Sequence, residues 1–143
     1  MSQSAMEKRI CDEFIKFQRE LVGRGPECTR VMICRDMVII RSTGVLTKEE
    51  KHVSGTRKGR SLVKQLRMEL RETYIERIED VIREITQCKV MSSHGDISIR
   101  TGEHIEVFIL DADLEKSLED NRQVEFLFDE AARVRVVGSL KGW

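Results

Sequence analysis

Apolar residues recur at helical spacing near the start of the chain. Five of them, three or four positions apart, predict the buried face of a helix over residues 4–22: Met6, Ile10, Phe14, Phe17 and Leu21. Residues 4–7 (Ser-Ala-Met-Glu) have the spacing of a capping box, so we expect the helix to begin there. Gly23 and Pro26 predict its end, because glycine adopts the left-handed cap and proline cannot continue a helix.

A segment rich in β-branched residues follows at 29–43. It predicts two antiparallel strands joined in a tight hairpin at the polar pair Arg35-Asp36. The second strand, residues 37–42, is almost continuously apolar, so we expect it in the middle of a sheet with both faces buried. Residues 47–50 (Thr-Lys-Glu-Glu) form a second capping box, which predicts a short helical turn that Ser54-Gly55 interrupts.

The longest periodic pattern lies in the middle of the chain. Apolar residues from Leu62 to Ile85 recur at helical spacing without glycine or proline, which predicts one helix over residues 58–87. Such a helix is on the order of 40 Å long. Because the core of a small domain does not cover that length, we expect a second copy of the chain to cover part of it, giving a homo-oligomer. Glu79 and Arg83 have the spacing of a supporting ion pair.

The last third of the chain predicts further strands and a closing extension. Residues 88–92, 97–99 and 105–110 are strand candidates, with a turn at 94–96 (His-Gly-Asp). Residues 111–121 predict a short acidic helix that packs through Leu114 and Leu118, and the remaining tail fits a short strand or helix. The predicted fold class is therefore α+β, a small antiparallel sheet with helices packed on one face. We expect one domain over residues 4–110 and a C-terminal extension over 111–143.

Composition narrows the class of protein. The 143 residues are 40% apolar and 35% charged, as in a soluble globular domain. Lys plus Arg and Asp plus Glu number 25 each, so the overall charge gives no reason to expect nucleic acid as a partner. The longest apolar run is too short to cross a bilayer, and the polar start of the chain has no signal-like pattern. We therefore expect a cytoplasmic protein without a transmembrane segment.

Candidate chemistry from cysteine and histidine is weak. The four Cys and three His include no closely paired ligands such as CxxC or HxxxH, so we expect no metal and no cofactor. The chain has no GxSxG motif, and no spacing identifies a Cys–His pair, although a pair formed in space stays open. The residues favour a non-enzymatic protein over an enzyme.

Charge is strongly segregated along the chain. Residues 41–71 contain nine Lys or Arg against three acids, and residues 102–130 contain ten acids against two bases. Five cations gather at the start of the long helix, where its N–H groups and dipole also favour an anion: Arg57, Lys58, Arg60, Lys64 and Arg67. They fit a small-anion or nucleotide-binding site. The second interpretation, which we favour, pairs them with the acidic segment of the same chain or of a neighbouring subunit.

Several short motifs occur in a specific order. They are Gly-Arg-Gly-Pro at 23–26, Leu-Thr-Lys-Glu-Glu at 46–50, Gly-Arg-Ser-Leu-Val at 59–63, and Val-Phe-Ile-Leu at 107–110. This order resembles the bacterial MpsC-like family over residues 4–110. The positions that match its pattern are Gly25, Pro26, Leu46, Thr47, Glu50, Gly59 and Arg67. One departure is Arg24, where the family commonly has Lys.

The resemblance implies a function without implying a catalytic site. The family is associated with a Na⁺-translocating, membrane-potential-generating system linked to inorganic-carbon uptake. A member without a membrane span looks like an accessory or regulatory component with a membrane transport protein as partner, either in the cytoplasm or peripheral to the inner face of the membrane. The matching residues equally suit fold-determining roles, with Gly25-Pro26 in a turn, Thr47 and Glu50 in a cap, and Arg67 in an internal salt bridge.

Overall fold

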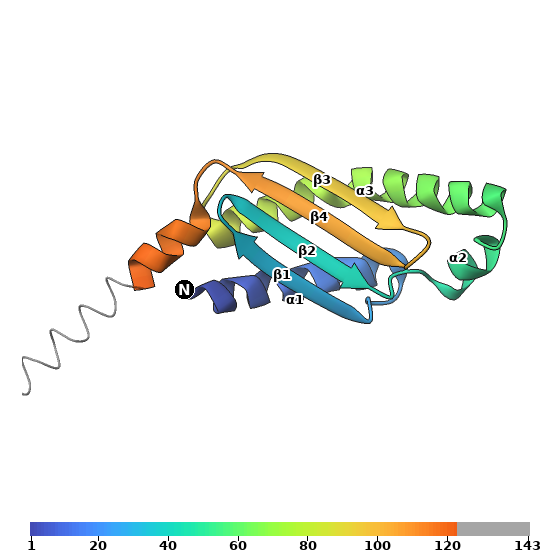
Figure 1. The fold of residues 1–143 in the computed structure, drawn as a ribbon, viewed down its shortest axis with the longest axis horizontal. Coiled ribbons are helices and arrows are strands. Elements are labelled where there is room, and N and C mark those ends of the chain that lie inside the picture. Colours follow the sequence, from blue (N-terminus) through green and yellow to red (C-terminus); the bar gives the residue numbers. More distant parts are fainter. Residues whose placement is uncertain (123–143) are drawn as a thin grey trace, which may run out of the picture.

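The computed structural model describes residues 1–122, which fold into helices on one side of a sheet (Figure 1). A short helix over residues 114–122 follows the last strand. The labelled elements are α1 (Gln3–Val22), β1 (Cys28–Cys34), β2 (Met37–Thr43), α2 (Lys48–Val53), α3 (Arg57–Thr86), β3 (Val90–Ser98) and β4 (Glu103–Leu110).

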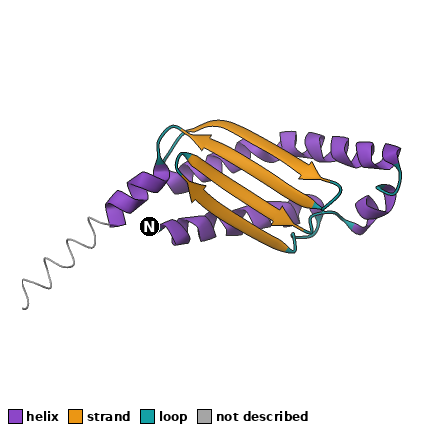
Figure 2. Ribbon diagram, viewed as in Figure 1, coloured by secondary structure: helices purple, strands orange, loops and turns teal. Residues whose placement is uncertain are grey.

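The four strands form one sheet in the order β1-β2-β4-β3, and every neighbouring pair is antiparallel. Helices α1 and α3 lie side by side behind this sheet, as Figure 2 shows. The predicted α+β class, with helices on one face of an antiparallel sheet, is therefore confirmed. The hairpin around Arg35-Asp36 is confirmed as well, since these two residues join β1 to β2.

The core fills the space between the sheet and the two long helices. Its most deeply buried members come from all three sides: Ile10 and Phe14 of α1, Ile78 and Ile82 of α3, and Val38, Ile40 and Phe108 of the sheet. A smaller cluster of Val45, Leu46, Val63 and Ile97 lies at the other end of the sheet. The α1 stripe and the second half of the α3 stripe are therefore buried as predicted, and the single long helix is confirmed. The prediction is wrong for Leu62 and Leu66 at the start of the α3 stripe, which are exposed.

The beginning of α1 differs from the predicted capping box. Its cap is Ser2, whose Oγ accepts a hydrogen bond from the Ala5 N–H at 3.1 Å. Glu7 instead accepts a bond from the backbone N–H of Ile33 at 2.8 Å, and the Gln3 amide donates to the Ile33 carbonyl at 3.1 Å. Glu7 and Gln3 therefore satisfy the free backbone edge of β1. The predicted end is confirmed, because Gly23 has the left-handed φ of 83°.

Strand β2 is central, as predicted, but it is not buried on both faces. Val38, Ile40 and Ser42 are buried toward the helices, whereas Ile39 and Arg41 point to the opposite, outer face. The prediction of two buried faces is wrong because no element within residues 1–122 covers the outer face (Figure 2). Central position in an antiparallel sheet does not require two covered faces.

Strand β3 passes straight through the predicted turn at 94–96. The chain turns instead at residues 99–102, where Gly102 has a φ of 70°. Gly95 lies opposite Glu106 of β4, and a Cβ there would collide with the Glu106 carboxylate. This glycine therefore provides space inside a strand and does not form a turn.

The structure also tests the predicted Glu79–Arg83 ion pair and the predicted acidic helix after the last strand. Glu79 accepts a hydrogen bond from Ser93 Oγ at 2.7 Å and Arg83 pairs with Asp80 at 3.1 Å, so the predicted Glu79–Arg83 pair is wrong. The acidic helix is confirmed at residues 114–122, and Leu114 and Leu118 are its buried contacts. The strand or helix expected in the tail lies outside the described residues.

Candidate functional site

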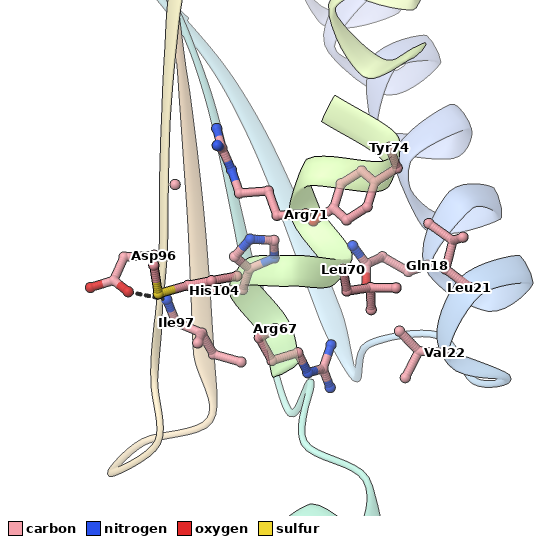
Figure 3. A pocket seen from close by; sticks show the side chains of 12 residues that line it. Gln18, Leu21, Val22, Arg67, Leu70, Arg71, Tyr74, Asp96, Ile97 and His104 are labelled. Carbon is pink, nitrogen blue, oxygen red and sulfur yellow. Dashed lines mark hydrogen bonds between the residues drawn. The ribbon is translucent and has the colours of Figure 1, made fainter. Parts of the chain in front are cut away.

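Three cations of α3 form a row that points toward the sheet and α2. Lys64, Arg67 and Arg71 lie three or four residues apart, so they occupy neighbouring positions on one side of the helix. Figure 3 shows Arg67 and Arg71 on α3 between the α1 side chains, such as Gln18, and strand residues that include His104. Each cation of this row meets a carboxylate from a different element.

The most buried carboxylate, Glu106 of β4, is fully enclosed. Arg71 donates to both of its oxygens, with Nε at 3.0 and 2.9 Å from Oε1 and Oε2 and Nη2 at 2.8 Å from Oε1. His104 Nε2 lies 2.8 Å from Oε2. An enclosed carboxylate is tolerated only when such partners replace its water, and the bare backbone of Gly95 leaves room for it.

The second pair joins α3 to α2 through Arg67 and Glu50. Arg67 Nε lies 2.7 Å from Glu50 Oε2, and Nη2 lies 2.6 Å from Oε1 and 2.7 Å from the Val45 carbonyl oxygen. Glu50 also closes the confirmed capping box with Thr47. Burial opposes ionisation of Glu50, but the hydrogen bonds from Arg67 and Thr47 outweigh it and hold the pKa of this carboxyl below its usual value.

Lys64 completes the row at the edge of the sheet. Its Nζ lies 2.9 Å from Asp96 Oδ1 and 2.6 Å from the Ile97 carbonyl oxygen. The hydrogen bond from Lys64 is the main reason that the pKa of Asp96 lies below its usual value. The lysine therefore binds both the side chain and the backbone of the edge strand β3.

The five predicted cations thus fall into two groups. Lys64 and Arg67 are neutralised inside the chain, whereas Arg57, Lys58 and Arg60 are exposed and form no ion pair within residues 1–122. Arg60 donates to the Ser54 carbonyl oxygen at 3.2 Å.

Within residues 1–122, the acidic segment supplies only half of the carboxylates that pair with cations of the basic segment. That segment supplies Glu106 to Arg71 and Glu103 to Arg41, the latter at 2.7 Å. The partners of Lys64 and Arg67 are Asp96 and Glu50, which precede it in the chain. Pairing within the chain is therefore extensive, but its geometry follows the packing of elements and not the charge blocks of the sequence.

The remaining family-pattern residues lie around the Arg67–Glu50 pair. Gly59 is buried where the end of α2 meets α3, and a Cβ on it would collide with the Val53 carbonyl oxygen. In the turn that contains Gly25 and Pro26, Arg24 donates to the Leu46 carbonyl oxygen at 2.6 Å. The motifs that are far apart in the sequence therefore meet at one end of the molecule.

A small cavity lies beside the Arg71–Glu106 pair. It has a volume of about 30 Å³ and its lining includes Gln18, Tyr74 and His104. This volume holds about one or two water molecules, which is far less than a nucleotide needs. Burial, followed by the charge of Glu106, raises the pKa of Tyr74 to about 12.

Arg71, Tyr74, His104 and Glu106 were not among the residues that the sequence predicts for a site. A signal for two of them does exist, because His104 and Glu106 occupy alternate positions of a strand whose next such positions, Phe108 and Leu110, are buried. The partners come from a helix, and nothing local links the two segments. Within residues 1–122, no group of three His, Cys, Asp or Glu side chains is placed to hold a metal ion.

The fold and the site together define a class: a small α+β protein whose long helix carries an internally neutralised cationic row. In this part of the chain, no helix combines the length and the apolar character that crossing a membrane requires. The chain belongs to the MpsC family, described as "Na+-translocating membrane potential-generating system (MpsC)", whose model matches residues 2–112. The resemblance drawn from the motifs is thereby confirmed.

Two relatives from Bacillus subtilis (strain 168) match most of the chain. The "Uncharacterized protein YbcI" is 42% identical over 118 residues, covering 82% of this chain and 95% of its own length. The "Uncharacterized protein YrhF" is 26% identical over 105 residues, covering 73% of this chain and 86% of its own length. No solved structure matches the chain.

Proposed function

We propose that this protein is a non-catalytic accessory component of the membrane-potential-generating system after which its family is described. It works in the cytoplasm by binding a protein of that system. The observation that carries this proposal is the neutralised row, in which Arg67 and Arg71 hold Glu50 and Glu106 through two or three hydrogen bonds each. Groups held in this way are suited to stabilising a fold and have no free position for a substrate.

The outer face of the sheet is the surface that we assign to the partner protein. Strands β1, β2 and β4 present a set of apolar side chains on this face: Met32, Met37, Ile39, Ile105, Val107 and Ile109. Met32 is 41% exposed and Ile105 is 37% exposed. Arg30 and His94 lie at the borders of this patch. An apolar centre with a polar rim is typical of a protein–protein interface.

Affinity purification of the tagged full-length chain from solubilised membranes tests the proposal. We expect one membrane protein to be retained in stoichiometric amount and to be lost with Ile105→Lys. Met91→Lys is the matched control, because Met91 is 65% exposed but lies outside the patch. Equal retention by both variants, or no retained membrane protein, would contradict the proposal. Light scattering on the purified chain separately tests the predicted homo-oligomer, in which a second copy of the chain covers part of α3.

A small-anion sensor is the second candidate function. The exposed, unpaired Arg57 and Lys58 within the described residues favour it, because they leave positive charge available at the start of α3. Inorganic phosphate would then raise the melting temperature, and Arg57→Gln/Lys58→Gln would abolish that rise. A melting temperature that does not change with phosphate would exclude this candidate.

A further inference from the structure

One end of the molecule projects past the sheet. This overhang, residues 48–68, consists of α2 and the first turns of α3. Figure 1 shows α2 and the start of α3 beyond the strand ends, while Lys64 already contacts β3. Four of its apolar side chains are about half exposed or more: Val53 at 45%, Leu62 at 54%, Leu66 at 58% and Met68 at 61%. Leaving such groups in water is unfavourable, so an apolar patch of this kind marks a contact surface.

Positive charge surrounds these apolar side chains. Five exposed cations of the overhang take part in no ion pair within residues 1–122: Lys48, Lys51, Arg57, Lys58 and Arg60. The overhang contains only two acids, Glu49 and Glu50, and Glu50 is already bound to Arg67. The α3 segment 57–68 contains no acid at all. The overhang therefore carries net positive charge.

On the surface of α3, cationic and apolar side chains lie next to one another. Lys58, Leu62 and Leu66 follow each other at four-residue intervals, so they form one exposed stripe along α3. On another side of the helix, a groove runs between α3 and the β3–β4 turn. Its lining includes Arg60, Met68, Ile99 and Arg100, which extend the mixed basic and apolar surface onto the sheet.

We infer that the overhang docks onto the surface of an anionic lipid bilayer. Basic side chains there bind lipid phosphates, while the side chains of Leu62 and Leu66 enter the boundary between headgroups and acyl chains. Nucleic acid fits less well, because the overhang has no Phe, Tyr or Trp on which bases could stack. A free phosphate ion would gain nothing from Leu62 and Leu66. This inference goes beyond the proposed function, since it requires lipid and no partner protein.

Vesicle co-sedimentation of the purified full-length chain tests the inference without any partner present. One set of vesicles contains equal parts of phosphatidylglycerol and phosphatidylcholine, and the other contains phosphatidylcholine alone. We expect binding to the anionic vesicles only, with a loss of affinity at high salt. Each cation removed weakens such binding about fivefold, so Arg57→Gln/Lys58→Gln lowers affinity on the order of thirtyfold.

Matched control variants distinguish binding through the overhang from binding through the overall charge of the protein. Arg9→Gln/Lys16→Gln removes two exposed cations of α1 and should leave the affinity within about twofold. Leu62→Ser/Leu66→Ser should weaken binding at least tenfold, whereas Met91→Ser, which changes an exposed apolar side chain outside the overhang, should not. Circular dichroism confirms that each variant is folded.

Four results would overturn the inference. They are no binding to anionic vesicles, equal losses with the overhang and control variants, and full competition by inorganic phosphate at unchanged ionic strength, which would assign the cations to a free anion. The fourth is a change from oligomer to monomer in Leu62→Ser/Leu66→Ser without loss of vesicle binding, which would assign the leucines to a second copy of the chain.

Discussion

Within residues 1–122, Arg67 is the one cation paired with Glu50, and replacing it with Ala removes that partner. The Glu50 residue is 8% exposed, and the side chains of both partners are 10% exposed, so water replaces the lost guanidinium poorly. The Val45 carbonyl oxygen also loses its Arg67 donor. Breaking a buried ion pair from one side costs about 3–5 kcal/mol. Because Glu50 keeps the Thr47 N–H at 2.8 Å, we expect about 3 kcal/mol, at the lower end of that range.

Urea denaturation of the full-length chain at neutral pH measures this loss. The urea concentration at the midpoint of unfolding should fall. The slope of the free energy of unfolding against urea concentration should stay the same, because the variant removes one interaction without changing how much surface unfolding exposes. Arg57→Ala is the control on the same helix, where an exposed arginine without an ion pair in the described region should change the free energy of unfolding by under about 0.5 kcal/mol. Arg67→Lys keeps the charge but loses the two-pronged geometry, so its stability should lie between those of the wild type and Arg67→Ala.

A small effect of Arg67→Ala would refute this reasoning. A loss below about 1 kcal/mol would mean that the pair contributes no more than an exposed surface ion pair. A gain in stability would mean that repulsion between neighbouring cations of α3 outweighs the bonds to Glu50. A phosphate response that is present in the wild type and absent in Arg67→Ala would assign Arg67 to an anion site instead.

Three further expectations follow from other buried groups. Gly95→Ala places a methyl group against the Glu106 carboxylate and should lower stability by about 1–3 kcal/mol in thermal melts. Gly55→Ala is the control, because its new Cβ lies 3.4 Å from the nearest neighbouring atom and should change stability little. Equal effects of the two variants would contradict the packing argument. Tyr74, the one tyrosine of the chain, should ionise near pH 12 in a spectrophotometric titration. Its contribution to the stability of the fold should be complete below pH 10.0 and lost as the pH rises toward about 12. A titration midpoint at pH 10.0 would contradict the burial of this side chain. Glu50 should contribute stability above pH 4.5 that is lost as the pH falls below this value. Glu50→Gln should therefore weaken the dependence of the free energy of unfolding on pH in the acid range. Identical pH dependences of the wild type and the variant would count against the lowered pKa of Glu50.

The helices and the first hairpin could be predicted from the sequence because their signals are local. The apolar stripes of α1 and α3 repeat with the helical period, and each repeat describes only one element. The Thr47–Glu50 capping box joins residues three positions apart, so its spacing is visible in the sequence. The same reasoning failed at residues 4–7, because Glu7 bonds to Ile33 of β1 and leaves the cap to Ser2.

Strand β3 shows why a local signal can mislead. A glycine between His94 and Asp96 is typical of a turn when read within its own segment. In the sheet, the same glycine faces Glu106 across the strand pair and provides the space that the carboxylate occupies. Glycine is required at position 95 because of a side chain on another strand, so the sequence of β3 alone does not indicate its role.

The sequence by itself determined the helices, the first hairpin, the fold class and the family, because these depend on periodic spacing and on the order of short motifs. It also determined that a dense group of cations opens the long helix. Only the tertiary structure decided what those cations do. Arg67 and Glu50 are 17 residues apart and Arg71 and Glu106 are 35 apart, so no helical or strand period connects them. Their pairing depends on the sheet order β1-β2-β4-β3, which brings β4 within reach of α3, and on the approach of α2 to Gly59. Ion pairs form between the groups that packing brings together, and packing is a property of the whole chain.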